Sequence, residues 1–308
     1  MKSMIACGLA ATFAIAGPML ATAAHAGQNE RLFGLTHDHR VVTFASNTPG
    51  VITSNRAITG LAAGERLIGI DLRATDRKLY TMGTSGSVYR LEGGAGGYAA
   101  INLGQISTPL TGSSFGFDFN PVPNRLRVVS DANQNLRLNP MASTVGTIVD
   151  RPLTLNGAPV IDLLAVAYTN NRAGARSTVL YGLDARSGGL VRALNANEGT
   201  YVTTNLAGQT FQPLGLPFDN SEIFGFDISG GTGQAFFNHR NSLYRLDLAN
   251  GTPSFVGDIG AGSLAGLTAG SVPEPSQWAM MLAGFGLVGL ARRRQRPPRS
   301  TLLRPALA

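Results

Sequence analysis

One short pattern recurs through this chain and constrains its fold more than any other feature. An apolar residue, a small residue, an apolar residue, a polar or small residue and an apolar residue follow one another. Such alternation with a period of two is typical of a β-strand rather than a helix. The pattern occurs five times, at residues 68–72 (IGIDL), 115–119 (FGFDF), 164–168 (LAVAY), 224–228 (FGFDI) and 265–269 (AGLTA).

A hairpin signal, made of two apolar runs around a polar turn, also occurs five times. The hairpins begin at Arg31, Lys78, Arg125, Val179 and Gln234. Four of the short strands precede a hairpin, but the first hairpin has no strand before it. The strand at 265–269 instead follows the last hairpin. It is therefore expected to pair with the first hairpin and complete its sheet.

The spacing of the pattern predicts the architecture. Successive copies lie 47, 49, 60 and 41 residues apart, counted along Asp71, Asp118, Ala167, Asp227 and Thr268. A sheet repeat of about 40–50 residues is typical of a four-stranded propeller blade. We expect an all-β, five-bladed β-propeller over residues 27–270, closed by pairing of its N- and C-terminal strands. A β-sandwich or an irregular β-solenoid would also fit regular turns, but the orphan last strand favours a closed ring.

The N-terminus has the features of a secretory signal peptide over residues 1–26. Lys2 precedes an apolar run, and Ala24 and Ala26 are the small residues that a signal peptidase reads. The run is too short for the ~20 apolar residues of a spanning helix. The only cysteine, Cys7, lies within this segment, so the mature chain has no disulfide, thiol nucleophile or cysteine metal site.

The C-terminal segment, residues 271–308, has three parts. Pro273, Glu274 and Pro275 are followed by an apolar stretch at 278–291 and an arginine cluster at 292–296. As a helix, these 14 apolar residues would extend about 21 Å, short of the ~30 Å hydrocarbon core. Local thinning would allow insertion, with the arginines on the cytoplasmic side.

This tripartite arrangement closely resembles the PEP-CTERM protein-sorting signal. The resemblance implies export in a Gram-negative bacterium that makes extracellular polysaccharide, with cutting near the triplet by an exosortase membrane peptidase. The tail continues to Ala308, longer than is usual for the signal. The chain is then transiently anchored in the inner membrane by its C-terminal helix before it reaches the cell envelope or the extracellular space.

The basic character of the chain comes from these two end segments. The formal charge is +7, but residues 27–273 hold 18 basic and 17 acidic side chains, which leaves +1 for the body. A pI near 10 would otherwise suggest a nucleic-acid partner. We expect no nucleic-acid binding.

The body also resembles a known family. The segments GFDFNPVPNRLRVVSDANQNLRLNP (116–140), AVAYTNN (165–171) and LYGLD (180–184) are similar to the bacterial domain-of-unknown-function family 4394. The resemblance covers nearly all of the mature body. It implies a secreted repetitive β domain and assigns no activity.

Asp71, Asp118 and Asp227 are the leading candidate site residues because they share one position of the strand pattern. Equivalent positions of propeller inner strands converge at the axis, so the three carboxylates could bind a hard cation such as Ca²⁺. They could also supply the acid and base of a glycosidase. Alternatively, each aspartate accepts backbone N–H bonds in its own turn. No other cofactor is expected.

Arg125, Arg127 and Arg137 form a second candidate site. Arg125 and Arg127 alternate on one strand and Arg137 lies on its hairpin partner. A basic face of this kind could contact the anionic groups of an acidic polysaccharide. Local pairing with Asp118 or Asp131, or a solvated strand edge, is the simpler alternative.

Other motifs point to no chemistry. His37, His39 and His239 lie at hairpin turns and lack further ligands at metal-site spacing. No glycine-rich phosphate loop precedes a helix, and the one Gly-x-Ser-x-Gly match, at residues 112–116, leads into a strand pattern rather than a helix and is no nucleophile elbow. Two hypotheses follow. The protein is a non-enzymatic envelope or matrix module that binds polysaccharide or an envelope protein, or it is a glycosidase or lyase that uses the inner aspartates.

Overall fold

The computed structural model describes residues 29–142, 144–159, 161–217 and 225–270, and their regular secondary structure is entirely β-strand. The expected signal peptide and the sorting segment with its apolar helix lie outside the described residues. No helix within the described ranges is long and apolar enough to cross a membrane.

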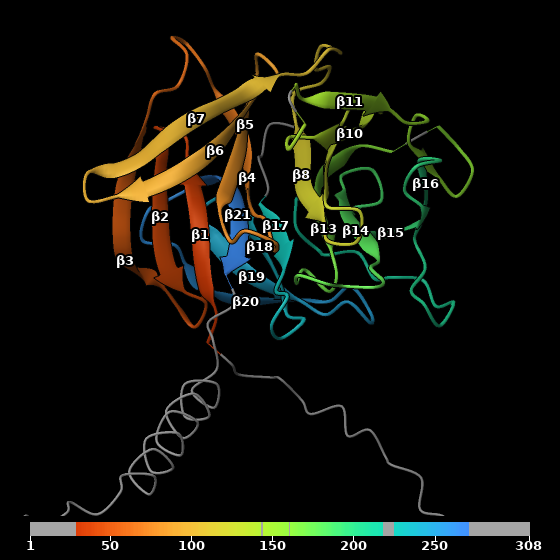
Figure 1. The fold of residues 1–308 in the computed structure, drawn as a ribbon. Helices are drawn as coiled ribbons and strands as arrows, with labels where there is room; N and C mark the ends of the chain where they lie inside the picture. The colour runs from red at the N-terminus through yellow and green to blue at the C-terminus, as the bar shows by residue number, and fades with distance from the viewer. Residues whose placement is uncertain (1–28, 143, 160, 218–224, 271–308) are drawn as a thin grey trace, which may run out of the picture.

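Five strands surround a common axis (Figure 1). They coincide with the five copies of the sequence pattern to within one or two residues, because alternating apolar and small residues suit a strand buried on both faces. These inner strands are β4 (Leu67–Leu72), β8 (Phe115–Asn120), β13 (Leu163–Tyr168), β17 (Phe226–Ile228) and β21 (Leu264–Gly270).

The other strands extend outward from the inner ones, and neighbouring strands are antiparallel in all but two short pairings. One sheet has eight strands in the order β21-β1-β2-β3-β7-β6-β5-β4. Its new members are β1 (Arg31–Thr36), β2 (Arg40–Ala45), β3 (Thr48–Thr59), β5 (Leu79–Gly83), β6 (Ser87–Gly94) and β7 (Gly97–Gln105). Only a short parallel pairing of β3 with β7, at Ile58–Tyr98 and Thr59–Ala99, joins the two antiparallel halves of this sheet.

Three further sheets complete the body, in the orders β11-β10-β9-β8, β12-β16-β15-β14-β13 and β17-β18-β19-β20. The strands not yet given are β9 (Arg125–Ser130), β10 (Asn135–Asn139), β11 (Gly146–Val149), β12 (Thr154–Leu155), β14 (Leu180–Asp184), β15 (Gly189–Asn195), β16 (Thr200–Val202), β18 (Ala235–His239), β19 (Ser242–Leu246) and β20 (Pro253–Asp258). The body is therefore all-β, with four sheets in a propeller-like arrangement.

The last strand pairs with the first, as the sequence pattern predicts. β21 and β1 are antiparallel, with Arg31 opposite Gly270 and Phe33 opposite Thr268. The edge of β1 is thereby covered and unpaired backbone groups are avoided. This pairing places Arg31 beside Gly270, so the first and last strands of the described body lie side by side (Figure 1).

The small residue of the pattern sits where inner strands approach each other. A Cβ at Gly116 would lie 2.9 Å from the backbone nitrogen of Val166 on the next inner strand. At Gly225 it would lie 2.2 Å from the nitrogen of Leu267. Glycine is required at these positions because the neighbouring backbones leave no room for a side chain. Between the sheets, apolar clusters such as that of Phe117, Leu126 and Val128 fill the core.

Candidate functional site

Three aspartates meet near the C-terminal ends of three inner strands. Asp71 lies on β4, Asp118 on β8 and Asp227 on β17, and the residues are 1%, 1% and 2% exposed. One carboxylate oxygen from each lies within 4.8 Å of the other two. The convergence predicted from the shared position in the strand pattern is therefore present. Within the described residues no other group of three or more acidic, histidine or cysteine side chains has this geometry.

Each aspartate joins its own strand to the next one in the ring. Its Oδ2 accepts a hydrogen bond from the backbone N–H one residue after the equivalent position of the neighbouring inner strand. The donors are Phe119 to Asp71 at 2.8 Å, Tyr168 to Asp118, and Ala269 to Asp227 at 2.6 Å. The carboxylates thus hold neighbouring sheets together. Asp71 and Asp227 also accept the backbone N–H of the next residue, Leu72 and Ile228, each at 2.6 Å, so local bonds of the kind considered from the sequence are present as well.

The same ring contains Thr268 of β21, at the fourth position of the fifth pattern. Its hydroxyl lies 2.9 Å from Asp71 Oδ1 and 2.8 Å from Asp227 Oδ2, and it accepts the N–H of Leu72 at 3.1 Å. In the sequence, Thr268 indicated only the register of the last strand. Its polar side chain, at a position that aspartate holds in three of the other four copies, was the available signal.

The electrostatics of the cluster follow from its burial. Loss of water raises the pKa of all three aspartates, since the charged form is disfavoured in the interior. The pKa of Asp118 lies well above its usual range because of burial first and then the negative charges of Asp71 and Asp227. Burial, together with repulsion from Asp71, raises the pKa of Asp227 to about 7.

This geometry does not favour glycoside hydrolysis. The reaction needs two carboxylates about 5–9.5 Å apart that flank a bound sugar. Here all three carboxylates are buried, with residue exposures of 1–2%. A polysaccharide chain does not reach them in this arrangement.

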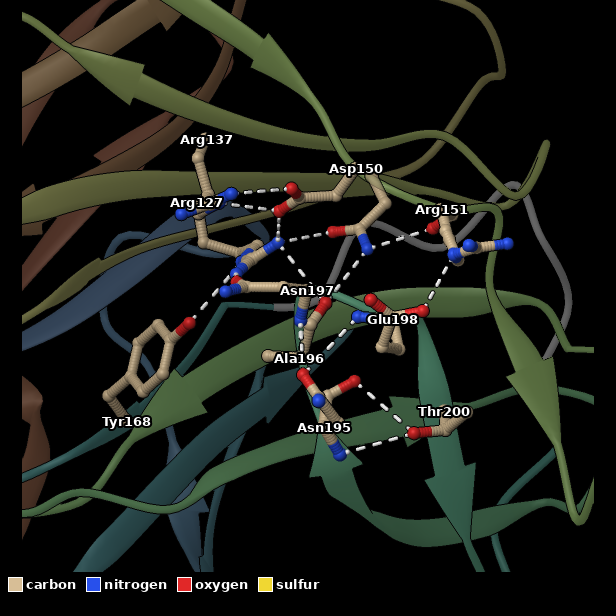
Figure 2. Close-up of polar contacts among 11 residues, drawn as sticks. Arg127, Arg137, Asp150, Arg151, Tyr168, Asn195, Ala196, Asn197, Glu198 and Thr200 are labelled. Carbon is tan, nitrogen blue, oxygen red and sulfur yellow. Dashed lines mark hydrogen bonds and ion pairs between the residues drawn. The ribbon is translucent and has the colours of Figure 1, made fainter.

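Arg127, one of the predicted glycan-contact residues, is buried rather than exposed. The residue is 1% exposed and its guanidinium bonds to groups of two sheets (Figure 2). One nitrogen contacts Asp150 at 2.7 Å and Asn135 at 2.6 Å, and another contacts Asn197 at 2.8 Å. Its remaining partners are the hydroxyl of Tyr168 and the carbonyl oxygen of Ala196.

The three arginines therefore do not form one exposed basic face. Arg137 makes two bonds to Asp150, at 2.7 and 2.8 Å, and its side chain is 28% exposed. Among the described residues, Arg125 bonds only to the carbonyl oxygens of Pro123 and Asn124, and it is half-buried. Arg127 and Arg137 both pair with Asp150. The sequence had suggested Asp118 or Asp131 as the alternative local partners. Asp150 lies outside the hairpin, so local spacing did not indicate it.

The histidines lie at hairpin turns, as predicted. His37 and His39 flank the β1–β2 turn, and the Nε2 atom of His37 lies 3.4 Å from Ser263 Oγ. His239 ends β18, is buried, and its Nε2 atom lies 3.1 Å from the carbonyl oxygen of Pro217.

Comparison with known families identifies the body. A family model described as "Domain of unknown function (DUF4394)" matches residues 28–268. The chain belongs to this family. The resemblance seen in the sequence is confirmed, and the three aspartates and Thr268 all lie within the DUF4394 match.

A second family model covers the C-terminal segment. The PEP-CTERM protein-sorting motif matches residues 271–295 and includes Pro273, Glu274 and Pro275. The motif implies export, sorting to the cell surface and processing by an exosortase. A search of curated proteins finds no match.

Several solved structures are similar to the DUF4394 body. A chain of the nidogen–laminin complex is 12% identical over 79% of this chain and 98% of its own, with a TM-score of 0.46. A Bacteroides thetaiotaomicron protein of unknown function is 15% identical over 75% of this chain and 58% of its own, with a TM-score of 0.42. YCF48 bound to a D1 peptide is 9% identical over 80% of this chain and 90% of its own, with a TM-score of 0.38. At these scores the similarities carry no argument about function.

Proposed function

We propose that the mature protein is a non-catalytic binding or structural module of the cell envelope or extracellular matrix. Its body is a five-bladed β-propeller closed by β21 and β1. A signal peptidase removes residues 1–26, and the C-terminal helix anchors the chain transiently in the inner membrane before an exosortase acts near Pro273–Pro275. The ligand is a polysaccharide or an envelope protein.

One observation carries this proposal: the residues that could serve as acid and base in catalysis instead connect neighbouring strands. Asp71, Asp118 and Asp227 are buried and hold neighbouring inner strands through backbone N–H groups. The sorting motif supports a location at the cell surface, where the chain meets extracellular polysaccharide. Neither observation favours the alternative of a glycosidase or lyase.

Co-sedimentation and viscosity, measured together, test the proposal. The full-length chain in detergent is mixed with extracellular polysaccharide from the producing bacterium, and a detergent-matched polysaccharide sample is the blank. We expect the protein to sediment with the polysaccharide while the viscosity stays constant over hours. A falling viscosity would establish depolymerisation and overturn the non-catalytic assignment. Without either effect, the ligand is sought among envelope proteins.

An arginine variant tests whether the contact is with anionic sugars. Arg125 is half-buried and bonds only to carbonyl oxygens, so Arg125→Gln removes a charge without leaving a buried carboxylate unpaired. We expect weaker co-sedimentation of this variant, more so at low salt, if Arg125 contacts an acidic polysaccharide. Equal binding by the variant and the wild-type chain would remove Arg125 from the proposed contact.

A further inference from the structure

The aspartate cluster has the dimensions of a cation site. A hard divalent cation such as Ca²⁺ holds oxygen ligands at about 2.3–2.6 Å, so oxygens on opposite sides of it lie up to about 5 Å apart. The oxygens that Asp71, Asp118 and Asp227 offer lie within 4.8 Å of one another. They come from three strands of the ring, so their positions are set by the fold rather than by one flexible loop.

A second observation singles out one atom of the cluster. Asp118 is 1% exposed, and its Oδ1 atom is buried without a hydrogen-bond partner. Buried polar atoms are nearly always paired, so such an atom requires an explanation. Glu65, another buried carboxylate, shows the ordinary arrangement: its oxygens accept bonds from the backbone N–H and hydroxyl of Ser85 and from the hydroxyl of Tyr89. Asp118 also faces Asp71 and Asp227, whose charges act on it directly, and its carboxyl lies close enough to that of Asp71 for a hydrogen bond when one of the two carries a proton.

No positively charged side chain of the described residues neutralises the cluster. The ion pairs among the described residues all involve carboxylates outside the cluster, namely Asp76, Glu92, Asp150, Asp162 and Glu198. Unneutralised buried carboxylates cost several kcal/mol each. A cation or protons must therefore supply the missing charge.

The hydroxyl of Thr268 does not remove this deficit. It lies within hydrogen-bond distance of Asp71 Oδ1 and of Asp227 Oδ2, yet it has one hydrogen and can donate to only one of them. The second contact joins two oxygens with no proton between them when both carboxylates are ionised. A proton on one carboxylate supplies the missing hydrogen, whereas a metal ion bound to both carboxylates offsets their negative charge.

We propose that Asp71, Asp118 and Asp227 bind one hard divalent cation, Ca²⁺ or Mg²⁺, at the axis of the body. The Oδ1 atom of Asp118 is a direct ligand, and the other two aspartates each contribute an oxygen. The ion joins three of the five inner strands.

Metal analysis of the full-length chain tests this proposal. The protein, in detergent, is stripped with EDTA and dialysed against Ca²⁺ or Mg²⁺ alone, and bound metal is measured by mass spectrometry alongside thermal unfolding. We expect one ion per chain and a Tm that rises with the concentration of the bound metal. A wild-type chain that binds neither ion and whose Tm does not change with either metal overturns the proposal.

Two variants locate the ion. Asp118→Asn keeps an amide oxygen for the N–H of Tyr168 but removes a charge, and we expect it to lose the bound ion and the metal-dependent rise in Tm. Asp247→Asn changes an exposed carboxylate outside the cluster and is expected to bind one ion as the wild type does. Metal retained by Asp118→Asn overturns the site. If that variant does not fold, Asp227→Asn takes its place, while the wild-type stoichiometry alone still decides whether an ion binds.

Protons are the competing explanation and give the opposite result. If they neutralise the cluster, the wild-type chain binds no metal, and Asp118→Asn is at least as stable as the wild type at neutral pH because one buried charge is gone. That outcome overturns the cation proposal and leaves the non-catalytic function proposed above unaffected, because that function is tested by polysaccharide binding and viscosity.

Discussion

Arg127 shows how a single buried charge can join two sheets. It lies on β9, but its partners Asn197 and Ala196 belong to the loop that follows β15 (Figure 2). Its counterion Asp150 has a side chain only 5% exposed. Removal of one partner of such a pair leaves the other charge buried and undercompensated, which is where most of the energetic cost arises.

We predict that Arg127→Met lowers the free energy of unfolding by about 3 kcal/mol, at the lower end for a broken buried pair because Arg137 still binds Asp150. Urea unfolding followed by circular dichroism measures the change. The matched control is Arg151→Met, whose side chain is 75% exposed and pairs with Glu198, also largely exposed. We expect almost no change for this control, since water already screens the pair. Equal effects of the two substitutions would contradict the structural role of Arg127.

At the scale of the strand, the small residue of the pattern determines how closely inner strands pack. Gly116 of β8 faces Val166 of β13, and Gly225 faces Leu267 of β21. In β13 the equivalent position is Ala165, which the structure accommodates. The strand pattern therefore encodes spacing between sheets as well as the strand itself.

We predict that Gly116→Ala destabilises the body by about 1–3 kcal/mol, the usual cost of added volume in a packed core. Its Cβ would lie 2.9 Å from the nitrogen of Val166 and 2.8 Å from a methyl group of Val129. Gly96→Ala is the control, because a Cβ at Gly96 meets no atom within 4 Å. Thermal unfolding compares the two. An unchanged Tm for Gly116→Ala would show that the inner strands separate easily and that the close approach is not required.

At the scale of the whole molecule, β21 is the strand that closes the body, because it pairs with β1. It is buried along its whole length, with Leu264 fully buried and Leu267 3% exposed, and it covers the edge of β1. It also brings Thr268 to Asp71, a contact between residues 197 positions apart in the chain. Loss of β21 would expose the edge of β1 and open the ring of inner strands.

We predict that a fragment of residues 27–263 fails to fold cooperatively, whereas a fragment of residues 27–270 folds. The shorter fragment lacks β21 and leaves an apolar, unpaired strand edge that favours aggregation. Size-exclusion chromatography and thermal unfolding of the two fragments give the test. A monomeric, cooperatively unfolding 27–263 fragment would show that closure by β21 is dispensable.

Sequence patterns predicted many of the secondary-structure elements and one key pairing between them. The five inner strands, the five hairpins and the pairing of the last strand with the first all occur where alternation, turn residues and the orphan strand indicated them. Alternating apolar residues and turn-forming residues are local properties of the sequence, so they can be recognised without knowledge of the rest of the chain. The convergence of Asp71, Asp118 and Asp227 was also predictable, because equivalent positions of repeated strands meet at a common axis.

The roles of these side chains were decided only by tertiary structure. The pattern did not indicate that each aspartate bonds to the next sheet, that Thr268 lies between two of them, or that Arg127 is buried against Asp150. These contacts join residues that are 23 to 197 positions apart, and burial depends on how closely whole sheets approach. The sequence by itself determined the inner strands, the hairpins, the closing pair and the sorting signal, because each rests on local periodicity or a contiguous motif. The tertiary structure decided which polar groups lose water, because desolvation is a property of the packed assembly of sheets.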